Sequence, residues 1–303
     1  MFSKLFAESG LSLDRLKALL AVGATGSIVK ATGGNPVKQS QYSRQIKELE
    51  DFFRIKLVER HGKGIRLTSN GKELARISRF FLLGLSNFQR GCLMEEQRFC
   101  VGASATFIHR FLLPVISSAE VVQGDTRYRV EVVGDDEIER RLHDLTLDFG
   151  VTTRSTISRP LQLKELGKWQ LKLWVPSTLH KTERNAAVAF KERRLPLAIA
   201  AKELDASGVD IFGDHDCRLV CDNFLQALDA LKEQQAAAVL PEYLNLPVGP
   251  KSFLRVRMTA IDSRVFYFRL AWNPRLLRLN PHAARRKDFL SQALSEQMTA
   301  RSG

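Results

Sequence analysis

Residues 39–50, QSQYSRQIKELE, gather hydrogen-bonding side chains at the start of a segment with helical spacing. At 100° per residue, Tyr42, Ile46, Leu49 and Phe53 share one face, which predicts a buried stripe. Arginine can pair with guanine edges, glutamine with adenine edges, and serine and lysine with base edges or phosphates. Such side chains fill the opposite face and its flank, at Lys38, Gln39, Ser40, Ser43, Arg44 and Lys47. The pattern fits an ordinary solvated helix face or a face that reads DNA.

The elements before this segment favour a face that reads DNA. Residues 13–22, LDRLKALLAV, have helical apolar spacing. Ser27 can cap a short second helix, which the run Gly33-Gly34-Asn35-Pro36 ends. A short helix and a turn in front of a polar helix are typical of a helix-turn-helix. We therefore expect residues 37–53 to form the third helix of such a domain.

A basic hairpin and a long apolar helix are expected after this segment. The runs KLVER and GIRLT flank a Gly-containing loop and predict a β-hairpin. Three of its basic residues can lie along a phosphate backbone: Arg60, Lys63 and Arg66. Thr68 or Asn70 can cap the helix that follows, since Asn70 and Glu73 have capping-box spacing. Its apolar stripe predicts a dimer contact through Leu74, Ile77, Phe81 and Phe88.

The positive charge of the chain is concentrated in this first part. Residues 1–91 carry 16 Lys and Arg against 7 Asp and Glu, a net charge of +9, whereas the other 212 residues carry 30 against 26, a net of +4. A small basic domain joined to a nearly balanced one predicts a polyanion-binding module. A membrane surface is the competing polyanion. The basic residues do not line an amphipathic helix with exposed aromatic residues, which argues against it.

Strand-like and helix-like segments alternate from residue 98 onward, which predicts an α/β fold with largely parallel sheets. At 303 residues, the chain is long enough for two or three domains. The absence of a signal-like apolar region and of a long apolar run predicts a cytoplasmic protein, associated with the nucleoid if it binds DNA. Cys217 and Cys221 are too far apart along a strand for a disulfide, so we expect free thiols.

The order and spacing of these motifs resemble those of LysR-type transcriptional regulators. The stretch GSIVKATGGNPVKQSQYSRQIKELEDFFRIKLVERHGKGIRLTSNGKEL is similar to that family's winged helix-turn-helix, which has the pattern GSFxxAA, SQPALSRQIxxLE and LFxRxxRxxxLTxxG. Later segments resemble its effector-binding domain: FCVGASATFIHRFLLPVI, VEVVGDDEIERRLHDLTLDFGV, LVCDNFLQALDALKEQQAAAVLPEYL and YFRLAWNP. The resemblance runs from about Leu13 to Leu294.

The resemblance implies three parts. These are a winged helix-turn-helix over 1–68, a linker and dimerisation helix over 69–92, and a two-lobed α/β effector domain over 93–303, like type 2 periplasmic binding proteins. Lobe I would cover about 97–168 and 269–303, and lobe II about 169–268. The implied partners are double-stranded promoter DNA, a small-molecule effector and further copies of the chain, as a dimer or homotetramer. Carried over by position, the DNA contacts are Gln39, Ser40, Ser43, Arg44 and Lys63.

The chain departs from the family pattern in the recognition helix and in the expected effector cleft. Lys38 and Ser40 replace a Ser and a Pro, and Gly33 and Gly34 predict a short or frayed second helix. Ser104 and Thr106 match a polar loop that can hold an anion, or Ser104 is a simple helix cap. Where the family has small polar residues, this chain has carboxylates at Asp135 and Asp136 and alanines at Ala200 and Ala201. The family's Gly-rich turn is replaced by Gln234-Gln235-Ala236. We expect an effector that is cationic or zwitterionic, or a vestigial cleft.

Rival functions have weaker support in the sequence. It contains no GxSxG, HExxH, P-loop or GxGxxG motif and no CxxC pair, so we expect no catalytic residues, no cofactor and no metal site. A cytoplasmic solute-binding protein would explain the C-terminal two-thirds but not the basic N-terminal domain. An architectural or effector-independent DNA-binding regulator with an inert cleft remains an alternative.

Overall fold

The computed structural model describes residues 11–62, 64–93, 96–118, 126–206, 217–234, 236–249 and 252–302. The chain forms two compact units, one up to Cys92 and one from Leu93 onward. Within the described ranges, no helix combines the length and apolar character of a membrane span. The four cysteines are free thiols.

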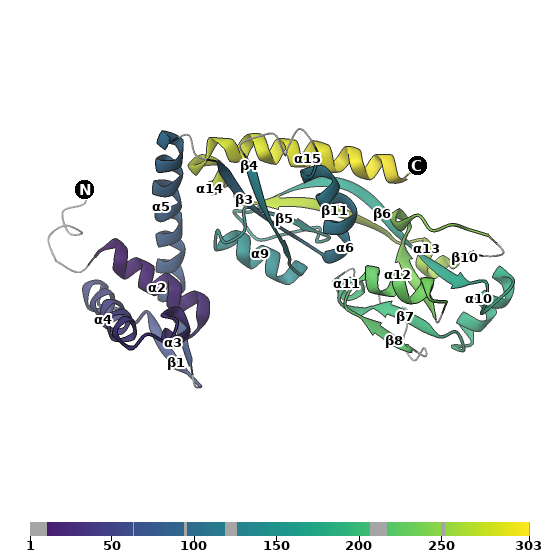
Figure 1. Ribbon diagram of the computed structural model, residues 1–303, viewed down its shortest axis with the longest axis horizontal. Helices are drawn as coiled ribbons and strands as arrows, with labels where there is room; N and C mark the ends of the chain where they lie inside the picture. The colour runs from purple at the N-terminus through teal and green to yellow at the C-terminus, as the bar shows by residue number, and fades with distance from the viewer. Residues whose placement is uncertain are drawn as a thin grey trace. The chain divides into compact units, whose positions relative to one another are not determined.

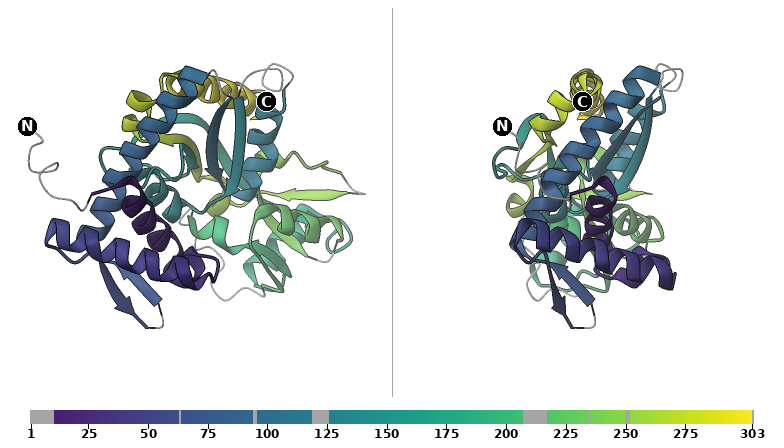
Figure 2. Two further views of the ribbon diagram at one scale, coloured as in Figure 1. Left: turned by 60° about the vertical axis from the view of Figure 1, so that its left-hand side comes forward. Right: turned by 90° about the vertical axis from the view of Figure 1, so that its left-hand side faces the viewer.

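The N-terminal unit is a helix-turn-helix with a β-hairpin and a long final helix (Figure 1). Its elements are α2 (Leu13–Thr25), α3 (Ile28–Ala31), α4 (Pro36–Phe53), β1 (Val58–His61), β2 (Gly64–Leu67) and α5 (Ser69–Leu93). Ser27 caps α3, and the predicted short second helix is confirmed at four residues. Both views in Figure 2 show the hairpin projecting beyond the helices of this unit.

Local signals determine where the helices of this unit end. Gly26 adopts φ +64 after α2, a left-handed conformation that glycine enters without steric cost. Thr68 caps α5, because its hydroxyl oxygen accepts a hydrogen bond from the Gly71 amide at 3.0 Å. The alternative cap at Asn70 is wrong, since α5 already begins at Ser69. Glu73, its expected capping-box partner, forms an ion pair with Arg76 instead.

Two apolar clusters hold α4 and the hairpin against α2. Leu16 and Leu19 of α2 pack with Leu49 of α4 and with Leu57. Ala18 and Val22 pack with Ile46, and Tyr42 and Ile65 lie against that cluster. Phe53 packs on the first cluster. The predicted stripe of Tyr42, Ile46, Leu49 and Phe53 is therefore the inner face of α4.

The C-terminal unit consists of two lobes built on one mixed sheet with the strand order β4-β3-β5-β11-β6-β9-β7-β8, in which β10 also pairs with β6. Its elements are β3 (Gln97–Ala103), α6 (Ala105–Phe107), the π-helical η1 (Ile108–Leu112), α7 (Leu113–Ile116), β4 (Thr126–Val132), α9 (Asp135–His143), β5 (Phe149–Thr152), β6 (Gln162–Pro176), α10 (Glu183–Lys191), β7 (Leu197–Ala200), α11 (Ala201–Ala206), β8 (Leu219–Cys221), α12 (Phe224–Lys232), β9 (Ala237–Pro241), η2 (Glu242–Leu244), β10 (Phe253–Val256), α13 (Thr259–Asp262), β11 (Val265–Trp272), α14 (Pro274–Leu279) and α15 (Pro281–Ser302).

The expectation of largely parallel sheets is wrong at the centre of this unit. β3 pairs in parallel with β4 and β5, and β7 with β8 and β9. However, β6 is antiparallel to β9, β10 and β11, and β11 is antiparallel to β5. The physical reason is the path of the chain. β6 leads from lobe I to lobe II and β11 leads back, so the two strands run in opposite directions.

The long strand β6 belongs to both lobes. Up to Gln170 it pairs with β11, and from Leu171 onward it pairs with β9. Lobe I therefore contains β3, β4, β5, β11 and the first part of β6, and lobe II contains β7 to β10 and its last part. Figure 1 shows α15 along the first lobe and α10 and α12 beside the second.

Candidate nucleic-acid interface and ligand cavity

Helix α4 is held in one orientation by a cap, an ion pair and the core. Asn35 accepts a hydrogen bond from the Lys38 amide at 3.1 Å, and Pro36 occupies the first helical position. Ile46 and Leu49 are buried against α2. Arg15 of α2 approaches the Glu48 carboxylate of α4 to 2.5 Å. These contacts determine which face of α4 points outward.

The outward face carries the residues expected to contact DNA. Five of the six predicted side chains on α4 are exposed: Lys38, Ser40, Ser43, Arg44 and Lys47. Arg44 is 75% exposed and lies 3.6 Å from Glu48. Gln39 is half-buried, and its amide nitrogen donates to the Gly34 carbonyl oxygen at 3.0 Å. Gln39 therefore stabilises the turn in front of α4, whereas the other five present their polar groups to solvent.

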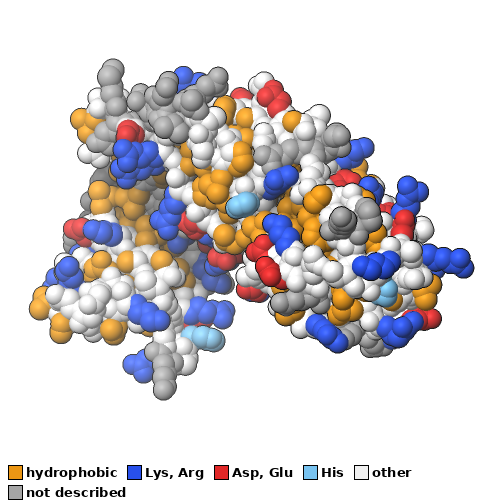
Figure 3. All heavy atoms as spheres, turned by 45° about the vertical axis from the view of Figure 1, so that its right-hand side comes forward, with side chains coloured by type: hydrophobic (Ala, Val, Ile, Leu, Met, Phe, Trp, Pro, Cys, Tyr) orange, Lys and Arg blue, Asp and Glu red, His pale blue; other side chains and the backbone are white. Residues whose placement is uncertain are grey.

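The basic hairpin follows α4 in the same unit. β1 and β2 pair antiparallel, with Val58 opposite Leu67. Arg60 and Arg66 are exposed, and Arg66 lies 3.7 Å from Glu59. Lys63, the third expected residue of the hairpin, lies outside the described residues. Figure 3 shows basic side chains around the hairpin, at the lower end of this unit.

Glu50 has a structural role that the sequence did not indicate. It follows the polar face of α4 in the sequence, yet only 8% of it is exposed. Its carboxylate accepts hydrogen bonds from the Leu57 amide at 2.8 Å, the Val58 amide at 3.3 Å and Lys56 Nζ at 3.1 Å. Burial raises the pKa of Glu50, but the hydrogen bonds and the Lys56 charge outweigh burial and lower it. Glu50 thus ties the start of the hairpin to α4.

The apolar stripe of α5 is largely exposed in the single chain. Ile77 is 54% exposed, Phe81 50% and Phe88 73%. Leu74, the first residue of the stripe, packs partly on the core of the N-terminal unit. Exposed phenylalanines in succession on one helix face form a surface that association can bury. The stripe therefore has the character of an interface.

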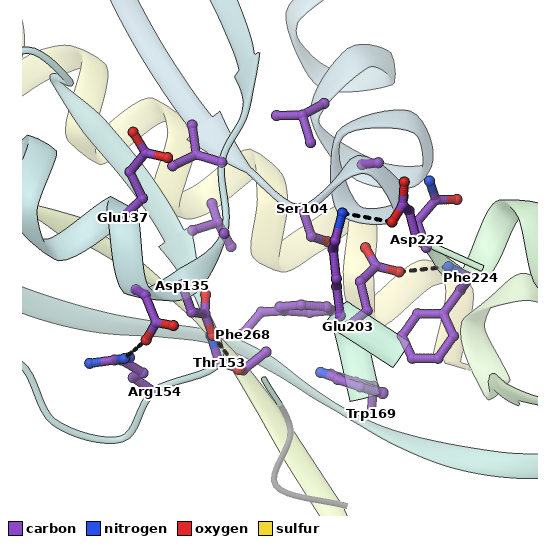
Figure 4. Close-up of a pocket in the computed structure, with 18 residues that line it drawn as sticks. Ser104, Asp135, Glu137, Thr153, Arg154, Trp169, Glu203, Asp222, Phe224 and Phe268 are labelled. Atoms are coloured by element: carbon purple, nitrogen blue, oxygen red, sulfur yellow. Dashed lines mark hydrogen bonds and ion pairs between the residues drawn. The ribbon is translucent and has the colours of Figure 1, made fainter. Parts of the chain in front are cut away.

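The C-terminal unit contains a cavity of about 760 Å³ at the junction of its lobes (Figure 4). Its lining comes from Ser104, Ala105, Val132, Val133, Gly134, Asp135, Asp136, Glu137, Val151, Thr153, Arg154, Trp169, Lys202, Glu203, Asp222, Asn223, Phe224 and Phe268. In Figure 4, Asp135, Thr153 and Arg154 lie on one side and Glu203, Asp222 and Phe224 on the other, with Phe268 between them. The size suits a small molecule.

Some of the predicted effector residues line this cavity and others do not. Ser104, Asp135 and Asp136 line it. Thr106 is fully buried and donates a hydrogen bond to Glu203 of the lining, and Ala200 is fully buried in β7. Ala201 begins α11 but is not part of the lining. Gln235, named for the replaced Gly-rich turn, lies outside the described residues.

Five residues that were not predicted from the sequence line the cavity from lobe II: Lys202, Glu203, Asp222, Asn223 and Phe224. They follow β7 and β8, two strands that pair in parallel. Ligands of α/β proteins bind at the carboxyl ends of such strands. This rule could have found these residues, since the predicted Ala200 and Ala201 directly precede Lys202.

The charged groups of the cavity lining have partners within this chain. The Asp135 carboxylate accepts two hydrogen bonds from Thr153, one from the backbone amide at 3.0 Å and one from the side-chain hydroxyl at 2.5 Å. Arg154 forms an ion pair with Asp136, and Lys202 Nζ lies 2.6 Å from Asp222. The lining contains five Asp and Glu and two Lys and Arg, a formal charge of −3. Within the described ranges, no group of three or more His, Cys, Asp or Glu could hold a metal ion.

Together these observations define a winged helix-turn-helix unit joined through a long helix to a two-lobed α/β unit with a cavity at the junction of its lobes. Residues 13–72 match the bacterial regulatory helix-turn-helix protein domain of the lysR family. The N-terminal unit thus contains a LysR-family helix-turn-helix domain, and the chain has the fold of full-length LysR-type regulators.

Known relatives and solved structures agree with this assignment. The HTH-type transcriptional regulator HdfR of Yersinia pestis is 24% identical over 166 residues, which cover 54% of this chain and 57% of HdfR. The chain thus matches a little over half the length of this relative. ArgP from Mycobacterium tuberculosis superposes with a TM-score of 0.66 at 21% identity, covering 94% of this chain and 97% of ArgP. LysG from Corynebacterium glutamicum, solved with bound effector Arg, gives a TM-score of 0.65 at 18% identity. The superposition covers 94% of this chain and 99% of LysG.

Proposed function

We propose that this protein is a sequence-specific DNA-binding transcription regulator of the LysR type. The observation that carries the proposal is the exposed polar face of α4, which lies within the segment that matches the LysR-family domain. The fold is shared with CbnR, which was solved in complex with its target DNA, at a TM-score of 0.53, 18% identity and coverage of 91% of this chain and all of CbnR. Such a regulator acts in the cytoplasm, at the nucleoid.

In this proposal α4 lies in the major groove and the hairpin follows the phosphate backbone. Arg44 pairs with a base edge, with Gln39, Ser40 and Ser43 beside it. Lys38 and Lys47 supply phosphate contacts near the helix, and Arg60, Lys63 and Arg66 supply them from the hairpin. The exposed stripe of α5 forms a dimer contact, through which two copies bind two half-sites. A homotetramer is the further assembly that the resemblance implies.

The cavity at the junction of the lobes is the proposed effector site. Its volume and position suit a small molecule, and LysG, which has the same fold, was solved with its effector. An effector-independent regulator with an inert cavity is the second candidate. The observation in its favour is that the cavity carboxylates already bind groups of this chain. Neither candidate involves catalysis, in keeping with the regulators that resemble this chain.

The test is selection of DNA fragments by the purified full-length protein, followed by affinity measurements at the enriched motif. Arg44→Ala should lose about 1–3 kcal/mol, roughly a 5- to 150-fold drop in affinity, because one bidentate base contact is lost. Arg184→Ala is the matched control, since it removes an exposed arginine from α10 in the other unit. No enriched motif, or equal affinity of the two variants, would contradict the proposal.

A further inference from the structure

We infer that Glu203 determines the specificity of the cavity, because its carboxylate occupies the position that an anionic ligand would take. The carboxylate also joins the two lobes. This inference deepens the proposed effector site and rests on it. Its test needs no DNA. The inference can therefore fail while the protein still binds DNA, and DNA binding can fail while the inference holds.

The Glu203 carboxylate accepts hydrogen bonds from both lobes. In lobe I it accepts from the Thr106 hydroxyl at 2.7 Å and from the Thr106 amide at 3.3 Å. In lobe II it accepts from the Phe224 amide at 2.7 Å. Hydrogen bonds to an ionised carboxylate are roughly twice as strong as those between neutral groups. Glu203 therefore makes the contacts expected of a bound carboxylate ligand.

The chain also satisfies the neighbouring donors. Phe224, Leu225 and Gln226 are the first three residues of α12, and their amides would otherwise lack partners within the helix. Asn223 accepts from the Leu225 and Gln226 amides, each at 3.1 Å. Glu203 accepts from the remaining amide, that of Phe224. The start of α12 thus has none of these three donors left for a ligand anion.

The charges around Glu203 reinforce this exclusion. Its neighbours in the lining are four further carboxylates and two basic groups, Arg154 and Lys202, each of which is paired with a carboxylate. An anion would enter a lining with a formal charge of −3 and meet repulsion, which water and salt weaken at exposed groups such as Asp136 and Asp222. The cavity therefore favours ligands that carry positive charge and rejects simple carboxylates.

The experiment is chemical rescue of Glu203→Ala in the full-length protein. This substitution removes a CH2–carboxylate group, which corresponds in size and charge to acetate. We expect lower thermal stability, restored by sodium acetate but not by sodium chloride at the same ionic strength. Calorimetry should give at least about tenfold tighter acetate binding than for the wild type. Arg110 and Tyr243 also connect the lobes, through a 3.0 Å hydrogen bond, so the variant should fold.

Two further variants keep the inference open to contradiction. Asp222→Ala removes a carboxylate of the same cavity that pairs with the Lys202 side chain, so it should show no acetate-specific rescue. Glu203→Gln keeps the shape without the charge. It should unfold at lower urea concentration and remain insensitive to acetate. Unchanged stability of both Glu203 variants, equal acetate effects on Glu203→Ala and Asp222→Ala, or tight binding of acetate or succinate to the wild type would each overturn the inference.

Discussion

The two units of the protein use their polar groups in opposite ways. In the N-terminal unit, Lys38, Arg44 and Lys47 point outward from α4 and are exposed. In the C-terminal unit, the carboxylates of Asp135 and Glu203 accept hydrogen bonds from the protein's own backbone. The outward groups contribute little to stability and are available to a partner. The inward groups stabilise the lobes and restrict what the cavity can bind.

This difference means that a cluster of polar side chains indicates a binding surface only when their hydrogen-bonding groups are not already bonded to the protein itself. Glu50 is an informative exception in the first unit, because its carboxylate binds backbone amides as Glu203 does. We expect substitutions of outward residues to change assembly or DNA affinity at nearly constant stability. Substitutions of inward residues should change stability first.

The largest expected effect concerns the outward stripe of α5. The double substitution Phe81→Ala and Phe88→Ala should weaken the dimer by at least about 3 kcal/mol, because burying one such side chain contributes roughly 1.5–3 kcal/mol. This corresponds to a more than hundredfold rise in the dissociation constant. Sedimentation equilibrium of the full-length protein measures it.

Lys72→Ala is the control for the stripe, since it shortens an exposed side chain of the same helix outside the stripe. It should leave the dissociation constant unchanged. An unchanged dissociation constant of the double variant would mean that the stripe is not the interface. In that case only α4 and the hairpin of this unit would present side chains to a partner.

The next effect concerns close packing inside the N-terminal unit. A Cβ atom at Gly71 would overlap the carbonyl oxygen of Leu57, so α5 and the hairpin could not both keep their positions. Gly71→Ala should lower the free energy of unfolding by about 3 kcal/mol, at the upper end for overpacking. Gly91→Ala is the matched control, because a Cβ there meets nothing within 4 Å. Urea unfolding followed by circular dichroism separates the two variants, and equal midpoints would refute the packing argument.

A smaller effect is expected at Glu50. Glu50→Gln should cost about 1–3 kcal/mol at neutral pH, because the buried amides lose a charged acceptor. Since the folded pKa of Glu50 lies below the usual 4.5, its contribution is complete above pH 4.5 and is lost as the pH falls through the folded pKa. The variant should therefore lose less stability than the wild type on acidification through this range. Glu59→Gln, at a 53% exposed carboxyl group, should match the wild type.

The sequence predicted the elements of the N-terminal unit because local signals place them. Ser27 caps α3, and the periodicity of Ile46 and Leu49 marks the inner face of α4. The role of Glu50 could not be predicted in this way. Its partners, the Leu57 and Val58 amides, follow seven and eight residues later, and their approach depends on how the chain folds back.

The C-terminal unit was less predictable for the same reason. Strand–helix alternation indicated most of its elements but not the antiparallel direction of β6 and β11, which depends on the chain crossing between lobes twice. Asp135 and Asp136 were predicted from the resemblance to the family's effector-binding domain, which has a small polar pair after the second strand. Glu203 binds Thr106, which lies 97 residues earlier in the chain, and no local pattern indicates such a contact.

The smallest effect tests the outward face of α4 directly. Lys38 is exposed at the start of the helix, where its side chain and the helix N-terminus can both approach a phosphate. Lys38→Ala should weaken binding to all sequences by a similar factor and reduce the slope of log affinity against log salt concentration by about 0.9, the value for one phosphate contact. Lys191→Ala, which removes an exposed lysine from α10, should leave the slope unchanged. If Lys38→Ala instead changes the preferred sequence at constant salt slope, this lysine contacts a base edge, and the base-reading face begins one residue before Gln39.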